Sequence, residues 1–244
     1  MSEGLSVLQI ELRVHNLDAA MSFYGSVFSW GIYPSSASYA LVDTGLLPVV
    51  GILHDPRIPT GISPLIRVQD CQAAVQKAKD LGGRVFIQTA EIAGSGAFTA
   101  ALDPWGNLIY FWQPYSDGKP RPEREPINPF VFIEIATPNV EKATRYYSQL
   151  MGWSFWNVPS EQNYAIAEGN GLKRGIGLYG ADANSSGMVC YIQVNNLEET
   201  AQKIKAAGGQ VVVPPDKFLG EGRYLIFADP TGNRVGAFEP QPSS

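Results

Sequence analysis

The sequence contains few of the residues that build disulfide and metal sites. Its 244 residues include two cysteines, Cys71 and Cys190, which are too few for a disulfide framework or a cysteine-rich zinc site. With His15 and His54 as the only histidines, a histidine-based metal site is also short of ligands. These scarcities exclude the small disulfide-stapled and zinc-finger classes.

The chain also lacks a strong excess of one charge and a long apolar run. It has 18 basic and 23 acidic residues, with no long run of either sign, which argues against capture of nucleic acid or anionic membrane. No segment approaches the roughly 18 unbroken apolar residues of a membrane span, and no basic segment followed by an apolar one opens the chain. We therefore expect a cytoplasmic protein with no nucleic-acid or membrane partner. Its 45% of hydrophobic residues suffices for one large or two ordinary domains.

Internal repetition is the most informative feature of the sequence. The turn motif Asp103-Pro104-Trp105-Gly106-Asn107 recurs 126 residues later as Asp229-Pro230-Thr231-Gly232-Asn233, and Gly82-Gly83 recurs at the same offset as Gly208-Gly209. The halves are therefore copies of each other. The polar, proline-rich segment between them predicts a linker over 118–126, with domains over 1–117 and 127–244.

A weaker duplication within each half predicts four similar units. The first unit opens with an alternating strand pattern over Leu8–Val14, and a helical pattern follows at once. Each helix is expected to start after an Asx residue that caps its first turn: Asn16, Asp70, Asn139 and Asn196. About three short strand patterns come next. We therefore expect an α+β fold of four βαβββ units forming two domains, with curved mixed sheets and helices on the convex side.

These motifs resemble those of the vicinal oxygen chelate superfamily, which includes glyoxalases, bleomycin-resistance proteins and extradiol dioxygenases. The resemblance rests on residues 10–24 and 139–147, both Gly-Gly helix ends and both Asp-Pro-x-Gly-Asn turns. It extends from about residue 6 to residue 240 and is closest to tandem, two-domain glyoxalase-like proteins. Because this superfamily contains both enzymes and pure binding proteins, the resemblance implies the fold and leaves the function open.

Metal-dependent members of the superfamily take ligands from the first strand and from a later strand of each unit. In the first half, the resemblance places these positions at Gln9, Ser63 and Tyr110, of which only Gln9 is a plausible ligand. The fourth position lies near Val50–His54. There His54 is more simply a strand-end or loop histidine than a ligand.

The corresponding positions of the second half are Phe132, Val189 and Gly236, with glycine and apolar residues near the fourth position over 174–178. These residues cannot hold a metal in the manner of the family. We therefore expect no metal and no cofactor. If a metal is bound, Gln9 and His54 are the expected ligands.

Strand parity predicts which side chains line the concave face, because residues two apart on a strand share a face. In the first half the expected ligand-binding residues are Gln9, Glu11, Arg13, Ser63, Leu65, Arg67, Tyr110 and Trp112. In the second half the same parity gives a more apolar set, chiefly Phe132, Val189, Tyr191 and Phe238 around Glu134. The charged residues of the first half could instead form an internal ion-pair lattice, and its aromatic residues could be packing residues.

The leading hypothesis is a metal-free small-molecule binding protein of the bleomycin-resistance type, with a partly aromatic ligand in the first domain. The alternative is a metal-independent isomerase, lyase or cyclase, in which Glu11 is the general base, Tyr110 a donor, and Arg67 or Arg13 stabilises negative charge. A metal-dependent glyoxalase- or dioxygenase-like enzyme comes third. Two tethered homologous halves make a pseudo-dimeric monomer plausible, and a homodimer remains open.

Overall fold

The computed structural model describes residues 4–45, 47–116, 125–168, 170–182 and 187–241. Its elements follow the sequence repeat, so that every helix is preceded by one strand and followed by three. In chain order they are β1 (Val7–Arg13), α1 (Leu17–Phe28), β2 (Gly31–Ser36), β3 (Tyr39–Asp43), β4 (Val49–Leu53), β5 (Gly61–Arg67), α2 (Cys71–Asp80), β6 (Arg84–Ile92), β7 (Gly96–Leu102), β8 (Leu108–Pro114), β9 (Phe130–Thr137), α3 (Val140–Met151), β10 (Phe155–Asn157), β11 (Tyr164–Ala167), β12 (Ile176–Gly180), β13 (Met188–Gln193), α4 (Leu197–Ala206), β14 (Gln210–Phe218), β15 (Gly222–Ala228) and β16 (Arg234–Pro240).

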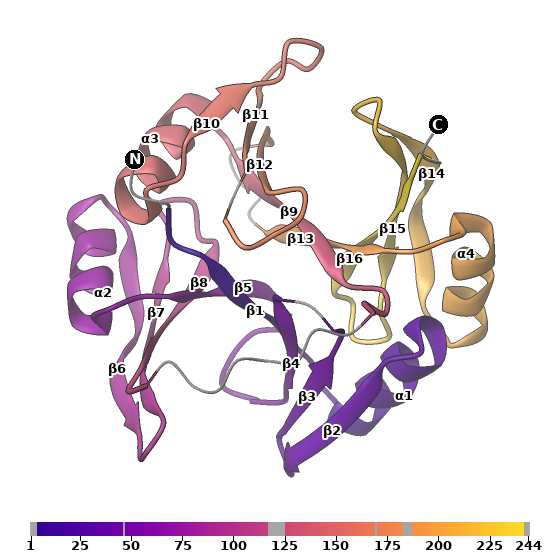
Figure 1. The fold of residues 1–244 in the computed structure, drawn as a ribbon, viewed down its shortest axis with the longest axis horizontal. Coiled ribbons are helices and arrows are strands. Elements are labelled where there is room, and N and C mark those ends of the chain that lie inside the picture. The colour runs from indigo at the N-terminus through magenta and orange to yellow at the C-terminus, as the bar shows by residue number, and fades with distance from the viewer. Residues whose placement is uncertain (1–3, 46, 117–124, 169, 183–186, 242–244) are drawn as a thin grey trace. The chain divides into compact units, whose positions relative to one another are not determined.

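The strands form two curved, open, eight-stranded sheets (Figure 1). The first has the order β2-β3-β4-β1-β5-β8-β7-β6, and the second repeats it as β10-β11-β12-β9-β13-β16-β15-β14. Both are mixed, because β5 runs parallel to β8 while β7 runs antiparallel to it, as their counterparts in the second sheet also do. The predicted α+β fold of four βαβββ units is thus confirmed. None of the helices in the described residues is long and apolar enough to cross a membrane.

All four helices begin as the sequence predicts. The capping side chains of Asn16, Asp70, Asn139 and Asn196 each accept a hydrogen bond from the backbone N–H three residues further on, at 2.8 to 3.0 Å. Such a bond satisfies one of the backbone donors that a helix start leaves open. After α2 and α4 the chain turns at Gly82 and Gly208, with φ of 97° and 89°. Glycine adopts these left-handed conformations without strain.

Contacts between residues group the chain into two compact units, each containing βαβββ modules from both halves. Unit 1 comprises Met1–Gln9, Ser63–Pro122 and Ile133–Met188, and unit 2 comprises Ile10–Ile62, Glu123–Phe132 and Val189–Ser244. The predicted linker over 118–126 lies mostly outside the described residues. The domain boundaries at 117 and 127 stay a prediction.

In unit 1, the turn motif of the first half is bonded to the helix and first strand of the second half. The Tyr147 hydroxyl of α3 donates to Oδ2 of Asp103 at 2.7 Å, and both residues are buried. Asn107 donates from Nδ2 to the same Asp103 oxygen at 2.8 Å and to the carbonyl of Ala136 at 3.0 Å. The repeated Asp and Asn of this motif therefore hold modules of different halves together.

Unit 2 contains the same arrangement with the halves exchanged. Tyr24 of α1 donates to Oδ2 of Asp229 at 2.9 Å, and Asn233 donates to the carbonyl oxygen of Arg13 at 2.9 Å. Tyr24 is fully buried, as is Tyr147 in unit 1. The repeated tyrosine is thus a core residue, as its helical spacing predicts.

Candidate functional site

Glu11 is the buried carboxylate of the first sheet, and a tyrosine two strands away holds it. The Tyr39 hydroxyl of β3 donates to Oε2 of Glu11 on β1 at 3.3 Å, although β4 lies between these strands. Gly51 of β4, which pairs with Leu41, has no side chain to obstruct the tyrosine. Glu11, Tyr39 and Gly51 form what we call the first bridge. All three residues lie in unit 2, and Glu11 is 5% exposed.

The second sheet repeats this arrangement within unit 1. The Tyr164 hydroxyl of β11 donates to Oε1 of Glu134 on β9 at 2.5 Å, across β12. Gly177 of β12 pairs with Glu134 and with Ile166. Glu134, Tyr164 and Gly177 form the second bridge. Burial and the neighbouring Glu134 raise the pKa of Tyr164 well above its ordinary value, so the phenol stays protonated and donates.

The sequence analysis selected Glu11 but missed its partner Tyr39. The signal was present, because a tyrosine and a glycine recur on the corresponding strands of both halves. Strand parity tells which face of the sheet a side chain lies on. It does not tell whether that side chain extends across a neighbouring strand to contact the next one. The strand order of the sheet supplies that missing information.

Arg13 shares the strand and the parity of Glu11, as expected. It is 7% exposed, and its Nε donates to the carbonyl of Pro59 at 2.8 Å. Its guanidinium lies against Gly61, where a Cβ atom would come within 2.6 Å of Nη2. A carboxylate and a guanidinium thus lie on one strand face of the first sheet as two buried charges of opposite sign.

The other six predicted ligand-binding residues belong to unit 1, where strand pairing aligns four of them. Leu65 of β5 pairs with Tyr110 of β8, and Arg67 pairs with Trp112. Ser63 is fully buried, and Gln9 is half-buried on β1. Arg67 is exposed, whereas Tyr110 is buried. How these six contact a ligand stays a prediction, as does the catalytic set Glu11, Tyr110 and Arg67.

Trp112 is half-buried, and its indole packs against a glycine. A Cβ atom at Gly96 would lie 2.7 Å from Cζ2 of its indole. In the second half Phe238 covers Gly222 in the same way, with Cζ at 2.9 Å from such an atom. The packing interpretation of this aromatic position therefore has direct support.

The metal positions of the second half are occupied by packed apolar groups in unit 2. The ring of Tyr191 lies directly over Gly236, where an added Cβ would come within 2.2 Å of Cδ1. Phe132 and Val189 are buried, and the Phe132 ring centroid lies 6.0 Å from that of Tyr191 and 5.5 Å from that of Phe218. A glycine, a valine and a phenylalanine supply no donor atom for a divalent ion.

The first half offers one amide, one hydroxyl and one phenol at its metal positions, namely Gln9, Ser63 and Tyr110. His54 lies just after β4, where its Nδ1 is 3.1 Å from the carbonyl oxygen of Val14. Within the described residues no group of three or more His, Cys, Asp or Glu side chains could hold a metal ion. These donor types do not fit the divalent metal that the resemblance implies.

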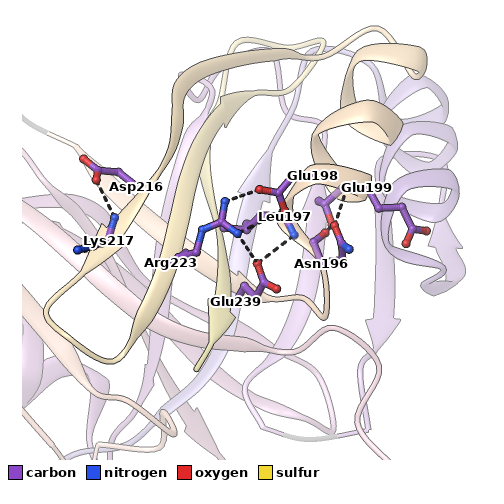
Figure 2. A network of polar contacts seen from close by, with 9 residues as sticks. Asn196, Leu197, Glu198, Glu199, Asp216, Lys217, Arg223 and Glu239 are labelled. Carbon is purple, nitrogen blue, oxygen red and sulfur yellow. Dashed lines mark hydrogen bonds and ion pairs between the residues drawn. The ribbon is translucent and has the colours of Figure 1, made fainter. Parts of the chain in front are cut away.

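A charged network lies at the start of α4 in unit 2 (Figure 2). Figure 2 shows Arg223 between Glu198 of the helix and Glu239 of β16, with Nη1 3.6 Å from Oε2 of Glu239. Glu239 also accepts a 3.4 Å hydrogen bond from the backbone N–H of Leu197. In the first half Gln113 accepts such a bond from the N–H of Cys71. The shared role of positions 113 and 239 is therefore to anchor the helix start.

A cavity of about 660 Å³ lies beside this network, lined by the β14–β15 hairpin and the end of β16. Arg223 and Glu239, which form part of its wall, pair with each other. Exposed pairs of this kind contribute little to stability. The charges of Arg223 and Glu239 are thus already matched within the wall.

Comparison with known proteins gives one family match, two relatives over nearly the full length and two over less than half of the chain. Residues 129–236 match the family described as Glyoxalase/Bleomycin resistance protein/Dioxygenase superfamily. The protein named "Putative glyoxylase CFP32" from Mycobacterium tuberculosis is 26% identical over 257 residues, covering 96% of this chain and 94% of the relative. The anthracycline biosynthesis protein DauV of Streptomyces sp. strain C5 is 26% identical over 118 residues, which cover 41% of this chain and 43% of DauV.

Solved structures share the fold over nearly the whole chain. The Mn(II)-bound glyoxalase from Novosphingobium aromaticivorans superposes with a TM-score of 0.73 at 15% identity, covering 98% of this chain and 83% of that one. Homoprotocatechuate 2,3-dioxygenase from Brevibacterium fuscum, in complex with 3,4-dihydroxyphenylacetate, gives a TM-score of 0.69 at 15% identity, covering 97% of this chain and 80% of that one. At such identities the likeness concerns the fold alone.

Proposed function

We propose, from the match of residues 129–236 to the Glyoxalase/Bleomycin resistance protein/Dioxygenase superfamily and the likeness to a putative glyoxylase, that the chain belongs to this superfamily and binds a small organic molecule without a metal. The ligand would lie on the face of the first sheet that carries Glu11 and Arg13. The observation that carries this proposal is the first bridge, in which a nearly buried carboxylate is held by Tyr39 on the strand face that also bears Arg13. Charged side chains that are fixed and shielded from water orient a ligand in its site, whereas apolar surface supplies most of the binding affinity.

Several features favour a partly aromatic ligand. Tyr39 contributes a half-buried ring, and Tyr33 and Leu41, which pair across β2 and β3, are both exposed. The unit 1 residues expected from the sequence, Arg67 among them, stay a separate prediction. The names of two relatives, "Putative glyoxylase CFP32" and "Anthracycline biosynthesis protein DauV", both refer to small molecules, which supports the proposal.

The first experiment is a thermal-shift screen of aromatic metabolites and antibiotics, with and without divalent metals. Binding to the native state raises the melting temperature by mass action. Glu11→Gln should then weaken a hit by roughly 10- to 150-fold, since a desolvated orienting charge is worth about 1.5 to 3 kcal/mol. Arg67→Ala and Tyr110→Phe should also weaken it.

Two substitutions serve as controls. Glu141→Gln removes an exposed charge on α3 that pairs with Arg145, and Tyr191→Phe alters the packed second half. Both should leave affinity unchanged. If Tyr191→Ala or Phe132→Ala abolishes binding in a folded protein while Glu11→Gln and Arg67→Ala do not, the site lies in the second half and the proposal is wrong.

A metal-independent isomerase, lyase or cyclase is the second candidate, favoured by the pairing of a buried carboxylate with a phenol at the first bridge. Such pairs suit general acid–base chemistry. Incubating each hit with the protein and analysing it by mass spectrometry and NMR tests this function. A catalyst would convert the hit, and Glu11→Gln would abolish conversion more strongly than binding.

A further inference from the structure

The cavity beside the charged network of unit 2, which we call the α4 cavity, has a row of charges in its wall. Lys217, Arg223 and Glu239 pair across β14, β15 and β16, so they share one face of the sheet. Arg223 forms an ion pair with Glu198 of α4, and Glu239 accepts from the backbone N–H of Leu197. This row therefore lies on the face that α4 covers, not on the inner face of the sheet.

The rest of the wall supplies apolar surface and open space. The rings of Pro215 and Pro240 belong to it, as does the turn of the β14–β15 hairpin at Gly220. An added Cβ at Gly220 would meet nothing within 4 Å, so the chain itself does not fill this end of the cavity. The volume of about 660 Å³ is in the range of sites for small organic molecules.

Two of the four charged residues in the wall have a partner, and two do not. Arg223 pairs with Glu239 as well as with Glu198. Asp216 and Lys217 are neighbours on β14 (Figure 2), and across the described ranges of the chain neither forms an ion pair. Oδ1 of Asp216 accepts only the backbone N–H of Lys217, at 2.7 Å. The cavity therefore offers one unmatched ammonium and one unmatched carboxylate.

The position of Lys217 is unfavourable without a ligand. It lies directly opposite Arg223 on the neighbouring strand, and like charges in such a cross-strand pair repel each other. The two carboxylates that pair with Arg223 leave the Lys217 ammonium unmatched. A negatively charged group between the two basic side chains would remove this repulsion.

The first half shows that the fold does not need these charges. The positions 126 residues earlier hold Ala90, Glu91, Ala97 and Gln113. Gln113 still accepts the backbone N–H that opens α2, so a neutral side chain anchors the helix start equally well. Tyr115, at the place of Gln241, bonds through its hydroxyl to Glu91. The second half has instead gained four charged side chains around an open cavity.

We propose that the α4 cavity is a second binding site, specific for a small zwitterion such as an α-amino acid with an aliphatic side chain. The ligand carboxylate lies between Lys217 and Arg223, and the ligand ammonium lies near Asp216. The aliphatic body packs on Pro215 and Pro240. A ligand with both charges matches a wall that has one unmatched group of each sign, whereas a simple anion or cation matches only one of them.

Isothermal titration of the full chain with L-leucine at low salt tests this site. Two matched probes each keep one charge: 4-methylpentanoate lacks the ammonium, and 3-methylbutylamine lacks the carboxylate. We expect leucine to bind more tightly than either probe, and its affinity to fall as salt rises. If leucine does not bind, or if either probe binds as tightly as leucine, the proposal is wrong.

Two variants each remove one of the unmatched charges. Lys217→Gln should weaken leucine by about three- to tenfold and leave 3-methylbutylamine unchanged. Asp216→Asn keeps an oxygen that can accept the backbone N–H of Lys217, and it should weaken leucine by a similar factor while leaving 4-methylpentanoate unchanged. Unchanged leucine affinity in both variants, or an equal loss for all three compounds, would contradict recognition of the two separate charges.

Controls in the first half locate the site. Because Asp216 and Lys217 are exposed, both variants should fold, and circular dichroism melting checks that they do. Glu91→Gln alters the first-half counterpart of Lys217, and Glu11→Gln alters the first bridge; both should leave leucine affinity unchanged. A loss in either would place leucine in the first half and overturn the assignment. Because the probe is aliphatic and the variants differ, this proposal and that of the first-half site can fail separately.

Discussion

Removing one hydroxyl group tests the bonding that joins the two halves in unit 1. Tyr147→Phe deletes the donor that lies 2.7 Å from Oδ2 of Asp103 and leaves the ring in place. Asp103 is 2% exposed and also accepts hydrogen bonds from Asn107 and from the backbone N–H of Trp105. A hydrogen bond to a charged group contributes about 1.5 to 3 kcal/mol to stability. We therefore expect Tyr147→Phe to lower the free energy of unfolding by that amount near pH 7.

The loss of unfolding free energy in Tyr147→Phe should be larger at neutral pH than at acidic pH. Burial raises the pKa of the Asp103 carboxyl, and the hydrogen bond from Tyr147 opposes that rise. Without the hydroxyl group this pKa rises further, so the variant loses most stability where the carboxylate must be ionised. As pH falls through the raised pKa of Asp103, the carboxyl becomes protonated, first in the variant and then in the unsubstituted protein. The hydrogen bond is then between neutral groups, and the difference should shrink to about 0.5 to 1.5 kcal/mol.

Urea unfolding of both proteins between pH 7 and pH 4, followed by tryptophan fluorescence and circular dichroism, measures these differences. Tyr24→Phe is the matched variant in unit 2, where Tyr24 donates to Asp229 at 2.9 Å. A loss below about 0.5 kcal/mol at pH 7, or a loss that grows as pH falls, would refute the reasoning. It would show that Tyr147 contributes packing rather than a bond to a charged carboxylate.

Three further outcomes are expected. Chelators should leave the melting temperature unchanged, and elemental analysis should find less than one metal per chain, because the metal positions offer poor donors. Stoichiometric zinc, nickel, iron or manganese would instead favour the metal-dependent enzyme over the metal-free binding protein. Gly236→Ala should cost about 1 to 3 kcal/mol in thermal unfolding, since its Cβ would lie 2.2 Å from the Tyr191 ring. Gly25→Ala in α1 should be neutral or stabilising, because its Cβ would lie 3.8 Å from Cδ1 of Ile32, and equal losses in the two variants would contradict the packing argument. Light scattering should give a monomer if the two tethered homologous halves form the pseudo-dimer expected from the sequence, whereas a stable dimer would show that the chain needs a partner.

The sequence by itself determined the fold, because the fold depends on local signals that repeat. Alternating strands, Asx residues at helix starts and glycine at helix ends act within a few residues, and the repeat offset shows that the same unit recurs. Strand parity likewise placed Glu11 and Arg13 on one face. The sequence also gives directly the residue types at the expected metal positions, such as Gly236 and Val189, which have no metal-binding side chain.

Only the tertiary structure decided which distant side chains meet. Tyr39 reaches Glu11 across an intervening strand, and Tyr147 bonds to a turn of the other half, 44 residues away. Neither contact has a local signal, because each depends on strand order and on which modules pack together. The contact between Tyr191 and Gly236 is also a tertiary one. Glycine has no side chain, and in the folded protein the Tyr191 ring occupies the space that a side chain at position 236 would take. Parity assigns a side chain to a face, but packing decides whether that face stays open to a ligand.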